Sequence, residues 1–186
     1  AHVLEDAAAA VAAVRDDRFA AAHRLDPGRL ALVGHSLGGF AALMTAAADP
    51  AVSAVASVAG VDFGAVAALC RSAPAFRADL VEAYAAELGP LRGTSGEALV
   101  AELEAAGESW RSARLAPRLA DRPVLLIGGG RDTVAPPDVH HEPVVTAYRS
   151  EPVERLEHHL FPTDHALSDH RVTLARTLLD FLARHA

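Results

Sequence analysis

Lysine is absent from the sequence, so all 17 basic residues are arginine, and Cys70 is the only cysteine. A single cysteine excludes an intrachain disulfide and a cysteine-based zinc cluster. The net charge is −7, both signs are interspersed and there is no basic stripe, which argues against a nucleic-acid partner. No secretory signal peptide is recognisable. The single thiol and the lack of a signal peptide favour a cytoplasmic location.

The sequence also lacks a convincing membrane span. Leu30–Ala48 is mostly apolar and about long enough to cross a bilayer, but His35 and the glycines within it indicate a turn. We therefore expect no membrane-spanning helix. At 186 residues the chain has the size of one domain, and its hydrophobic content of 51% is sufficient for a buried core.

One stretch organises the rest of the chain. Leu30–Val33 is a short apolar run typical of a buried strand, and Phe40–Ala48 has the small apolar residues of a packed helix. Between them lies Gly34-His35-Ser36-Leu37-Gly38, a Gly-x-Ser-x-Gly pattern. In this context the pattern predicts a strained turn that exposes Ser36 Oγ, with flanking glycines because a Cβ would collide with the strand or helix. The following helix N-terminus favours developing negative charge. An ordinary strand-to-helix turn with a capping serine is the alternative.

The remaining sequence alternates between strand and helix patterns. Apolar runs predict further strands at Val52–Ala59 and Val124–Ile127, and Val153–Leu160 is predicted as a fourth, more polar strand nearer the edge of the sheet. Helical patterns cover residues 3–14, 139–149 and 168–184. This alternation predicts an α/β fold in which helices flank a parallel sheet.

Residues 65–117 differ from the rest, because they contain helical stretches and no convincing strand. We expect them to form a small helical cap within a single domain of residues 1–186. In a parallel sheet such an insertion would lie over the C-terminal ends of the strands, where ligands bind. The alternative is a surface segment that does not cover a ligand site.

A candidate acid and a candidate base follow two of the predicted strands. Asp132 follows the third strand and His165 the fourth, just as Ser36 follows the first. The C-terminal ends of parallel strands meet at one edge, so we expect these side chains to lie together. Asp164 competes as the acid, but neighbouring side chains on a loop usually diverge. Asp138 is better placed to cap a helix.

The ten histidines raise the possibility of a metal site. His140-His141 and His158-His159 are adjacent pairs, whose members point in different directions on a helix or strand. Asp164-His165 together with Asp169-His170 has a ligand-like composition. There is no His-x-x-x-His pattern and no cysteine cluster, so we expect neither a metal nor a cofactor.

Three motifs carry a resemblance to a known family. The stretch Gly34–Gly39 resembles the nucleophile elbow of the α/β-hydrolase family of serine hydrolases. Gly-Arg-Asp-Thr-Val-Ala-Pro at 130–136 and Thr-Asp-His-Ala-Leu at 163–167 resemble its acid and histidine loops. The resemblance covers nearly the whole chain, is weak at residues 65–117, and extends to esterases, lipases and prolyl-oligopeptidase-like enzymes.

This resemblance implies a catalytic triad of Ser36, Asp132 and His165, with the Leu37 N–H in the oxyanion hole and His35 near the substrate. It implies a carboxylesterase-like enzyme that acts on a small-molecule acyl substrate. A serine peptidase or a thioesterase is the alternative within the family. A non-catalytic ligand-binding protein or an inactive fragment is the alternative of another class.

The chain has too little sequence before the elbow for a whole hydrolase sheet. In the family several strands precede the elbow strand, and the loop after one of them supplies a second oxyanion donor. Here a single helical pattern precedes Leu30. We therefore expect the C-terminal half of the fold, with the edge at Leu30–Val33 covered by a missing N-terminal segment or by another copy in a homo-oligomer.

Overall fold

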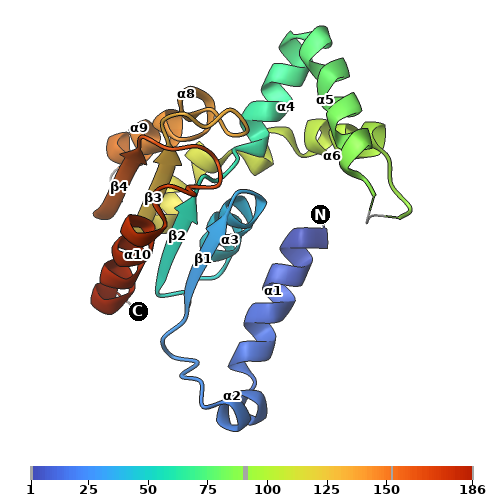
Figure 1. Ribbon diagram of the computed structural model, residues 1–186. Coiled ribbons are helices and arrows are strands. Elements are labelled where there is room, and N and C mark those ends of the chain that lie inside the picture. Colours follow the sequence, from blue (N-terminus) through green and yellow to red (C-terminus); the bar gives the residue numbers. More distant parts are fainter. Residues whose placement is uncertain (1, 90–91, 152, 186) are drawn as a thin grey trace. The chain divides into compact units, whose positions relative to one another are not determined.

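The computed structural model describes residues 2–89, 92–151 and 153–185, and the chain divides into two compact units. The first unit combines residues 1–61 with residues 113–186, and the second comprises residues 62–112. The first carries the sheet and all the residues proposed above for catalysis. Figure 1 follows the chain through both units.

The sheet of the first unit has four parallel strands in the order β1-β2-β3-β4. These are β1 (Ala31–His35), β2 (Ala54–Val58), β3 (Pro123–Gly129) and β4 (Arg155–Phe161). All four run in the same direction, so their C-terminal ends lie along one edge (Figure 1). The predicted parallel α/β sheet is confirmed.

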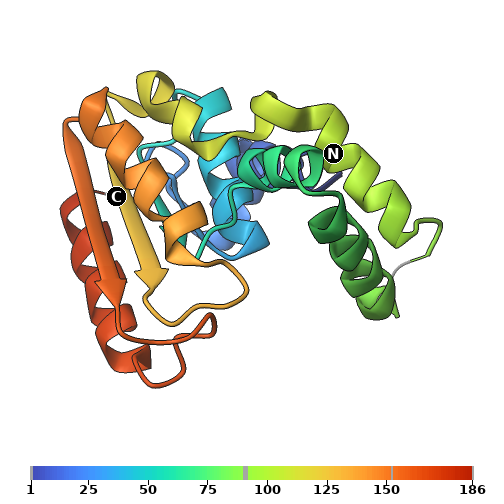
Figure 2. The ribbon, with the colours of Figure 1, turned by 90° about the horizontal axis from the view of Figure 1, so that it is seen from above.

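Helices of the first unit cover both faces of the sheet. They are α1 (His2–Arg15), α2 (Asp17–His23), α3 (Leu37–Ala48), α7 (Ala116–Leu119), α8 (Pro137–His140), α9 (Glu142–Ser150) and α10 (Arg171–His185). A short 3₁₀ helix, η2 (Ser112–Leu115), precedes α7. Residues of α3, α7 and α9 pack on one face, and α10 packs on the other (Figure 2).

The inner strands are buried on both sides because alternate side chains point to opposite faces. In β2, Val55 belongs to the core beneath α3, whereas Ala54, Ala56 and Val58 belong to the core beneath α10. β3 is likewise buried along its whole length. The two cores hold the C-terminal ends of β1 to β4 in a fixed arrangement.

Among the residues that the structure describes, no helix is both long and apolar enough to cross a membrane. The apolar stretch Leu30–Ala48 is divided between β1 and α3. His35 ends the strand, and the helix begins at Leu37.

The second unit is helical. It contains α4 (Phe63–Ser72), α5 (Pro74–Glu87), α6 (Gly96–Ala106) and the 3₁₀ helix η1 (Gly107–Trp110). A Cβ on Gly96 would lie 2.2 Å from the carbonyl oxygen of Val81, so glycine lets α6 begin directly against α5. The helical insertion was predicted at residues 65–117, and its action as a cap stays a prediction.

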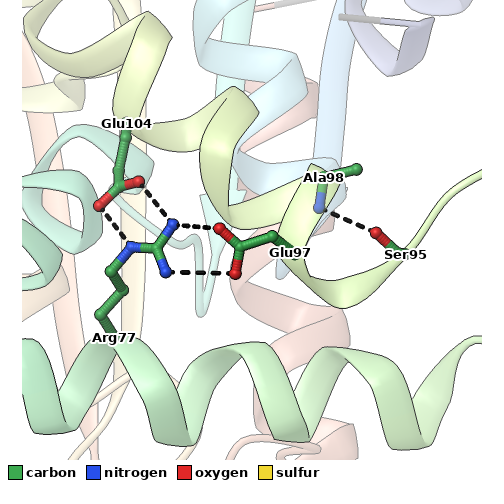
Figure 3. Close-up of polar contacts among 5 residues, drawn as sticks. All are labelled: Arg77, Ser95, Glu97, Ala98 and Glu104. Atoms are coloured by element: carbon green, nitrogen blue, oxygen red, sulfur yellow. Dashed lines mark hydrogen bonds and ion pairs between the residues drawn. The ribbon is translucent and has the colours of Figure 1, made fainter.

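A guanidinium group also joins α5 to α6 (Figure 3). Nε of Arg77 donates to Glu104 at 3.0 Å, and Nη2 donates to Glu97 at 2.6 Å. These two carboxylates hold the pKa of Arg77 above its usual range. Ser95 caps α6 by accepting a hydrogen bond from the N–H of Ala98 at 3.1 Å. The insertion is therefore an organised helical unit and not an extended loop.

Candidate active site

Ser36 lies at the sharp turn between β1 and α3. Its backbone has φ 57° and ψ −120°, a conformation that is strained for a residue with a Cβ. The N–H of Ser36 donates to the carbonyl of Val58 at 2.9 Å, and its own carbonyl accepts from Gly39 at 2.9 Å. The neighbouring strand and the first turn of α3 thus hold the strained backbone in place.

Two glycines make this turn sterically possible. A Cβ on Gly34 would lie 1.9 Å from the carbonyl oxygen of Gly38, and one on Gly39 would lie 2.7 Å from Ser57 Oγ. Both distances are far shorter than van der Waals contact. Gly38 has nothing within 4 Å of the same position. The predicted steric need therefore applies to Gly34 and to Gly39, and the prediction for Gly38 was wrong.

The structure brings Ser36, His165 and Asp132 together, although they are far apart in the sequence. Nε2 of His165 lies 2.9 Å from Ser36 Oγ, and Nδ1 lies 2.7 Å from Asp132 Oδ2. The three residues come from the C-terminal ends of β1, β4 and β3. A carboxylate only accepts hydrogen bonds, so Nδ1 carries the proton and Nε2 can accept from the serine hydroxyl.

Asp132 is held rigidly. Its side chain is fully buried, and Oδ1 accepts hydrogen bonds from the N–H groups of Val134 and Ala135, both at 2.8 Å. The competing acids lie elsewhere. Asp164 is exposed, and Asp138 is exposed and is not the N-cap of α8, because Pro136 has that position.

The N–H of Leu37 is available beside Ser36. Leu37 is the first residue of α3, where backbone N–H groups have no partner within the helix. Among the described residues no backbone or side-chain acceptor is bonded to this N–H. It can therefore donate to an anionic oxygen that forms next to Ser36 Oγ.

His35 contacts His165, the candidate base. Nε2 of His35 lies 2.8 Å from the backbone carbonyl oxygen of His165, and the two rings have centroids 4.9 Å apart. The substrate contact expected for His35 stays a prediction. The sequence did not predict the hydrogen bond between His35 and His165, because the two residues are 130 positions apart.

Three further residues join the acid loop to the histidine loop, and sequence reasoning did not assign them this role. Asp169 accepts hydrogen bonds from the hydroxyl of Thr163 and, at 3.0 Å, from Arg131. The Thr163 hydroxyl, followed by His170, lowers the pKa of Asp169 to about 2. The available signals were the positions of Arg131 and Thr163 within the two motifs and the ligand-like composition of Asp169-His170. In the part of the chain that the structure describes, no three His, Cys, Asp or Glu residues are grouped to hold a metal.

Two adjacent histidines, His140 and His141, follow the loop that carries Asp132. His140 is 8% exposed, and burial lowers its pKa to about 4 against the opposing effect of Asp132. Burial also lowers the pKa of His141 to about 4. Nε2 of His141 is buried and has no hydrogen-bond partner among the described residues. Both side chains are therefore neutral at pH 7.

This burial predicts a loss of stability in acid. The folded-state pKa of His140, about 4, lies below the value of ~6.5 in an unfolded chain, so the unfolded state takes up its proton first as the pH falls. The free energy of unfolding is therefore unaffected by this group above pH ~6.5. It falls as the pH drops from ~6.5 to the folded-state pKa, by about 3 kcal/mol in total. Urea unfolding at a series of pH values measures it.

The matched variants for this experiment are His140→Gln and His2→Gln, since His2 is 95% exposed. His140→Gln should reduce the dependence of the unfolding free energy on pH in this interval, whereas His2→Gln should leave it unchanged. An identical pH dependence in His140→Gln and the wild type would contradict the prediction.

Comparisons with known proteins agree with this fold. The chain is similar to an acylaminoacyl peptidase of Pyrococcus horikoshii, with TM-score 0.65 and 14% identity over 91% of this chain and 26% of that one. It is similar to an esterase of Pyrococcus furiosus, with TM-score 0.62 and 18% identity over 98% and 62% of the two chains. A puromycin-hydrolysing peptidase of Mycobacterium tuberculosis has TM-score 0.57 and 26% identity over 88% and 22%.

The chain thus spans about a quarter of the length of the two peptidases and 62% of the esterase. A search of curated protein sequences found no significant match. A profile of the alpha/beta hydrolase family matches residues 2–177, which is nearly the whole sequence and includes all three motifs. The chain therefore belongs to the alpha/beta hydrolase family.

Proposed function

We propose that this chain carries the catalytic residues of a serine hydrolase that cleaves carboxylic esters. The observation that supports this most is the line of hydrogen bonds from Asp132 through His165 to Ser36, with distances of 2.7 and 2.9 Å. Ser36 is the nucleophile, His165 the general base and acid, and Asp132 the group that orients the imidazole.

The reaction proceeds in two halves. Nε2 of His165 takes the proton of Ser36 Oγ while Oγ bonds to the carbonyl carbon of the substrate. His165 then gives this proton to the leaving alcohol as the C–O bond breaks, which leaves an acyl group on Ser36. A water molecule, deprotonated by His165, attacks the acyl carbon. The carboxylic acid leaves, and the proton returns to Ser36.

The Leu37 N–H supports the tetrahedral intermediates in both halves. It lies at the N-terminus of α3, where the helix dipole also favours negative charge. One such donor contributes about 3 kcal/mol to transition-state stabilisation. The donor acts on the oxygen that becomes an anion, so it raises the rate of the chemical step.

Amide cleavage is the second candidate. The similarity to the acylaminoacyl peptidase and to the puromycin-hydrolysing peptidase favours it, because both are named as peptidases and a peptidase cleaves amide bonds. The same residues would serve, with His165 protonating the amine that leaves. Kinetics with aryl esters and with aminoacyl anilides of matched acyl groups distinguish the two candidates.

The test of the proposed class is covalent labelling. A fluorophosphonate should modify the protein once, and peptide mapping should locate the adduct on Ser36. Denatured protein should not react, because its serine has no base beside it. A folded protein that resists the reagent at neutral pH would contradict the proposal.

We also propose that a further strand covers the outer edge of β1. In the described part of the chain no strand pairs with this edge, and Val33 within it is 46% exposed. A bare apolar edge is a template for pairing with another strand. The strand would come from a longer polypeptide or from a second copy, and the loop after it would supply a second oxyanion donor.

This proposal predicts that the 186-residue chain self-associates in solution. Light scattering after gel filtration measures the mass, and Val33→Arg should lower it, because charge on an edge strand opposes pairing. The monomeric form of the chain should be about 10²–10³ less active than a complete site, because it lacks the second oxyanion donor. A stable monomer that hydrolyses esters at ordinary rates would contradict both parts.

A further inference from the structure

Of the three residues of the proposed triad, His165 is the one whose own backbone makes no hydrogen bond to another backbone group among the described residues. Ser36 is held by the turn, and Asp132 is held by two backbone N–H groups. His165 lies between β4 and α10, in a stretch without regular structure. The ring of His165 must nevertheless keep two hydrogen bonds at once, so its backbone has to stay in place.

Backbone contacts hold this loop on either side of His165 but not at His165 itself. Thr163 accepts a hydrogen bond from the N–H of Arg131 at 2.9 Å, and Asp164 accepts one from the N–H of Leu167 at 3.2 Å. Among the described residues, no backbone N–H donates to the carbonyl of His165. Nε2 of His35, at 2.8 Å, is the donor that this carbonyl has.

The chemistry of this contact assigns a tautomer to His35. A carbonyl oxygen only accepts, so Nε2 of His35 carries the proton. His35 is the last residue of β1 and immediately precedes Ser36, and its ring lies beside that of His165 with a centroid distance of 4.9 Å. One side chain therefore connects the strand of the nucleophile to the backbone of the base.

We propose that His35 is a positioning residue that anchors the backbone of His165 and so keeps its imidazole in line with Ser36 and Asp132. This role rests on the proposed serine-hydrolase function. It differs from substrate binding, because the hydrogen-bonding nitrogen of His35 is bonded to the protein. It predicts an effect on the chemical step and on the His165–Asp132 hydrogen bond, with little effect on substrate affinity.

The test compares His35→Phe with His35→Gln. Phenylalanine keeps an aromatic ring but has no donor, whereas the side-chain amide of glutamine can place an N–H near the position of Nε2. His35→Phe should lower kcat and the rate of fluorophosphonate labelling by about tenfold and leave KM unchanged. His35→Gln should restore most of the loss. His2→Phe, at a site that is 95% exposed, is the matched control.

A second measurement is independent of turnover. The Nδ1 proton of His165, held by a buried carboxylate, should give a downfield proton resonance in the wild type. The resonance should broaden or disappear in His35→Phe and persist in His35→Gln. A wild type without fluorophosphonate reactivity would count against the proposed function, and the resonance would still decide the role of His35.

Three results would overturn the role of His35. One is wild-type kcat and an unchanged resonance in His35→Phe. Another is equal impairment in His35→Phe and His35→Gln, since the donor would then not matter. The third is a raised KM with unchanged kcat, which would instead indicate the substrate contact.

Discussion

Ser36→Ala should abolish turnover and fluorophosphonate labelling while the protein stays folded. Loss of the nucleophile in a serine hydrolase lowers kcat by about 10⁶. Alanine also has a Cβ, so the strained backbone at φ 57° is no better or worse accommodated than in the wild type. Kinetics on an aryl ester and thermal unfolding together measure both parts of this expectation.

Ser150→Ala is the matched control, because Ser150 is exposed on α9 and donates only to the nearby carbonyl of Thr146. It should behave as the wild type in both measurements. Ester hydrolysis by Ser36→Ala at a rate near that of the wild type would exclude Ser36 as the nucleophile. His165→Ala should resemble Ser36→Ala, since the hydroxyl would have no base.

Asp132→Asn should lower kcat by about 10⁴, as expected when the imidazole takes the wrong tautomer. Oδ1 of Asp132 accepts from Val134 and Ala135, so the carbonyl of the new amide should occupy that position. Its NH₂ group would then face Nδ1 of His165 and donate to it. The proton of the neutral ring would move to Nε2, which could no longer accept from Ser36.

The control for this experiment is Asp164→Asn, because Asp164 precedes His165 and is exposed. Its kcat should stay within about threefold of the wild type. Thermal unfolding of both variants separates a tautomer effect from a loss of structure. If Asp164→Asn were the more damaging change, the assignment of the acid would be wrong.

The strands and the order of the three motifs could be predicted from the sequence because both are local. An apolar run identifies a buried strand without reference to the rest of the chain, and β3 contains the predicted run Val124–Ile127. Parallel strands then bring their C-terminal ends to one edge. The proximity of Ser36, Asp132 and His165 follows from that topology.

The helices were harder to predict where capping decides their bounds. Asp16 accepts hydrogen bonds from the N–H groups of Arg18 and Phe19 and so begins α2, which the sequence pattern did not identify. The helix predicted at residues 139–149 is two helices, α8 and α9. Pro143 has no N–H to continue a single helix through this point.

Contacts between loops could not be predicted, because nothing in the local sequence reports them. The bond from His35 to the carbonyl of His165 and the Thr163–Asp169–Arg131 network depend on how two loops meet in space. The glycine pattern was also ambiguous. Only the structure distinguishes Gly39, which packs against Ser57, from Gly38, which has open space beside it.

At position 36 the residue that the backbone conformation favours differs from the residue that catalysis requires. A residue with a Cβ is strained at φ 57°, and glycine adopts this conformation freely. Ser36→Gly would therefore relieve the strain and remove the hydroxyl in one step, so selection for a more stable fold acts against the nucleophile. Selection for catalysis has to maintain the serine continuously. In a lineage released from that selection, drift at this codon should be towards glycine.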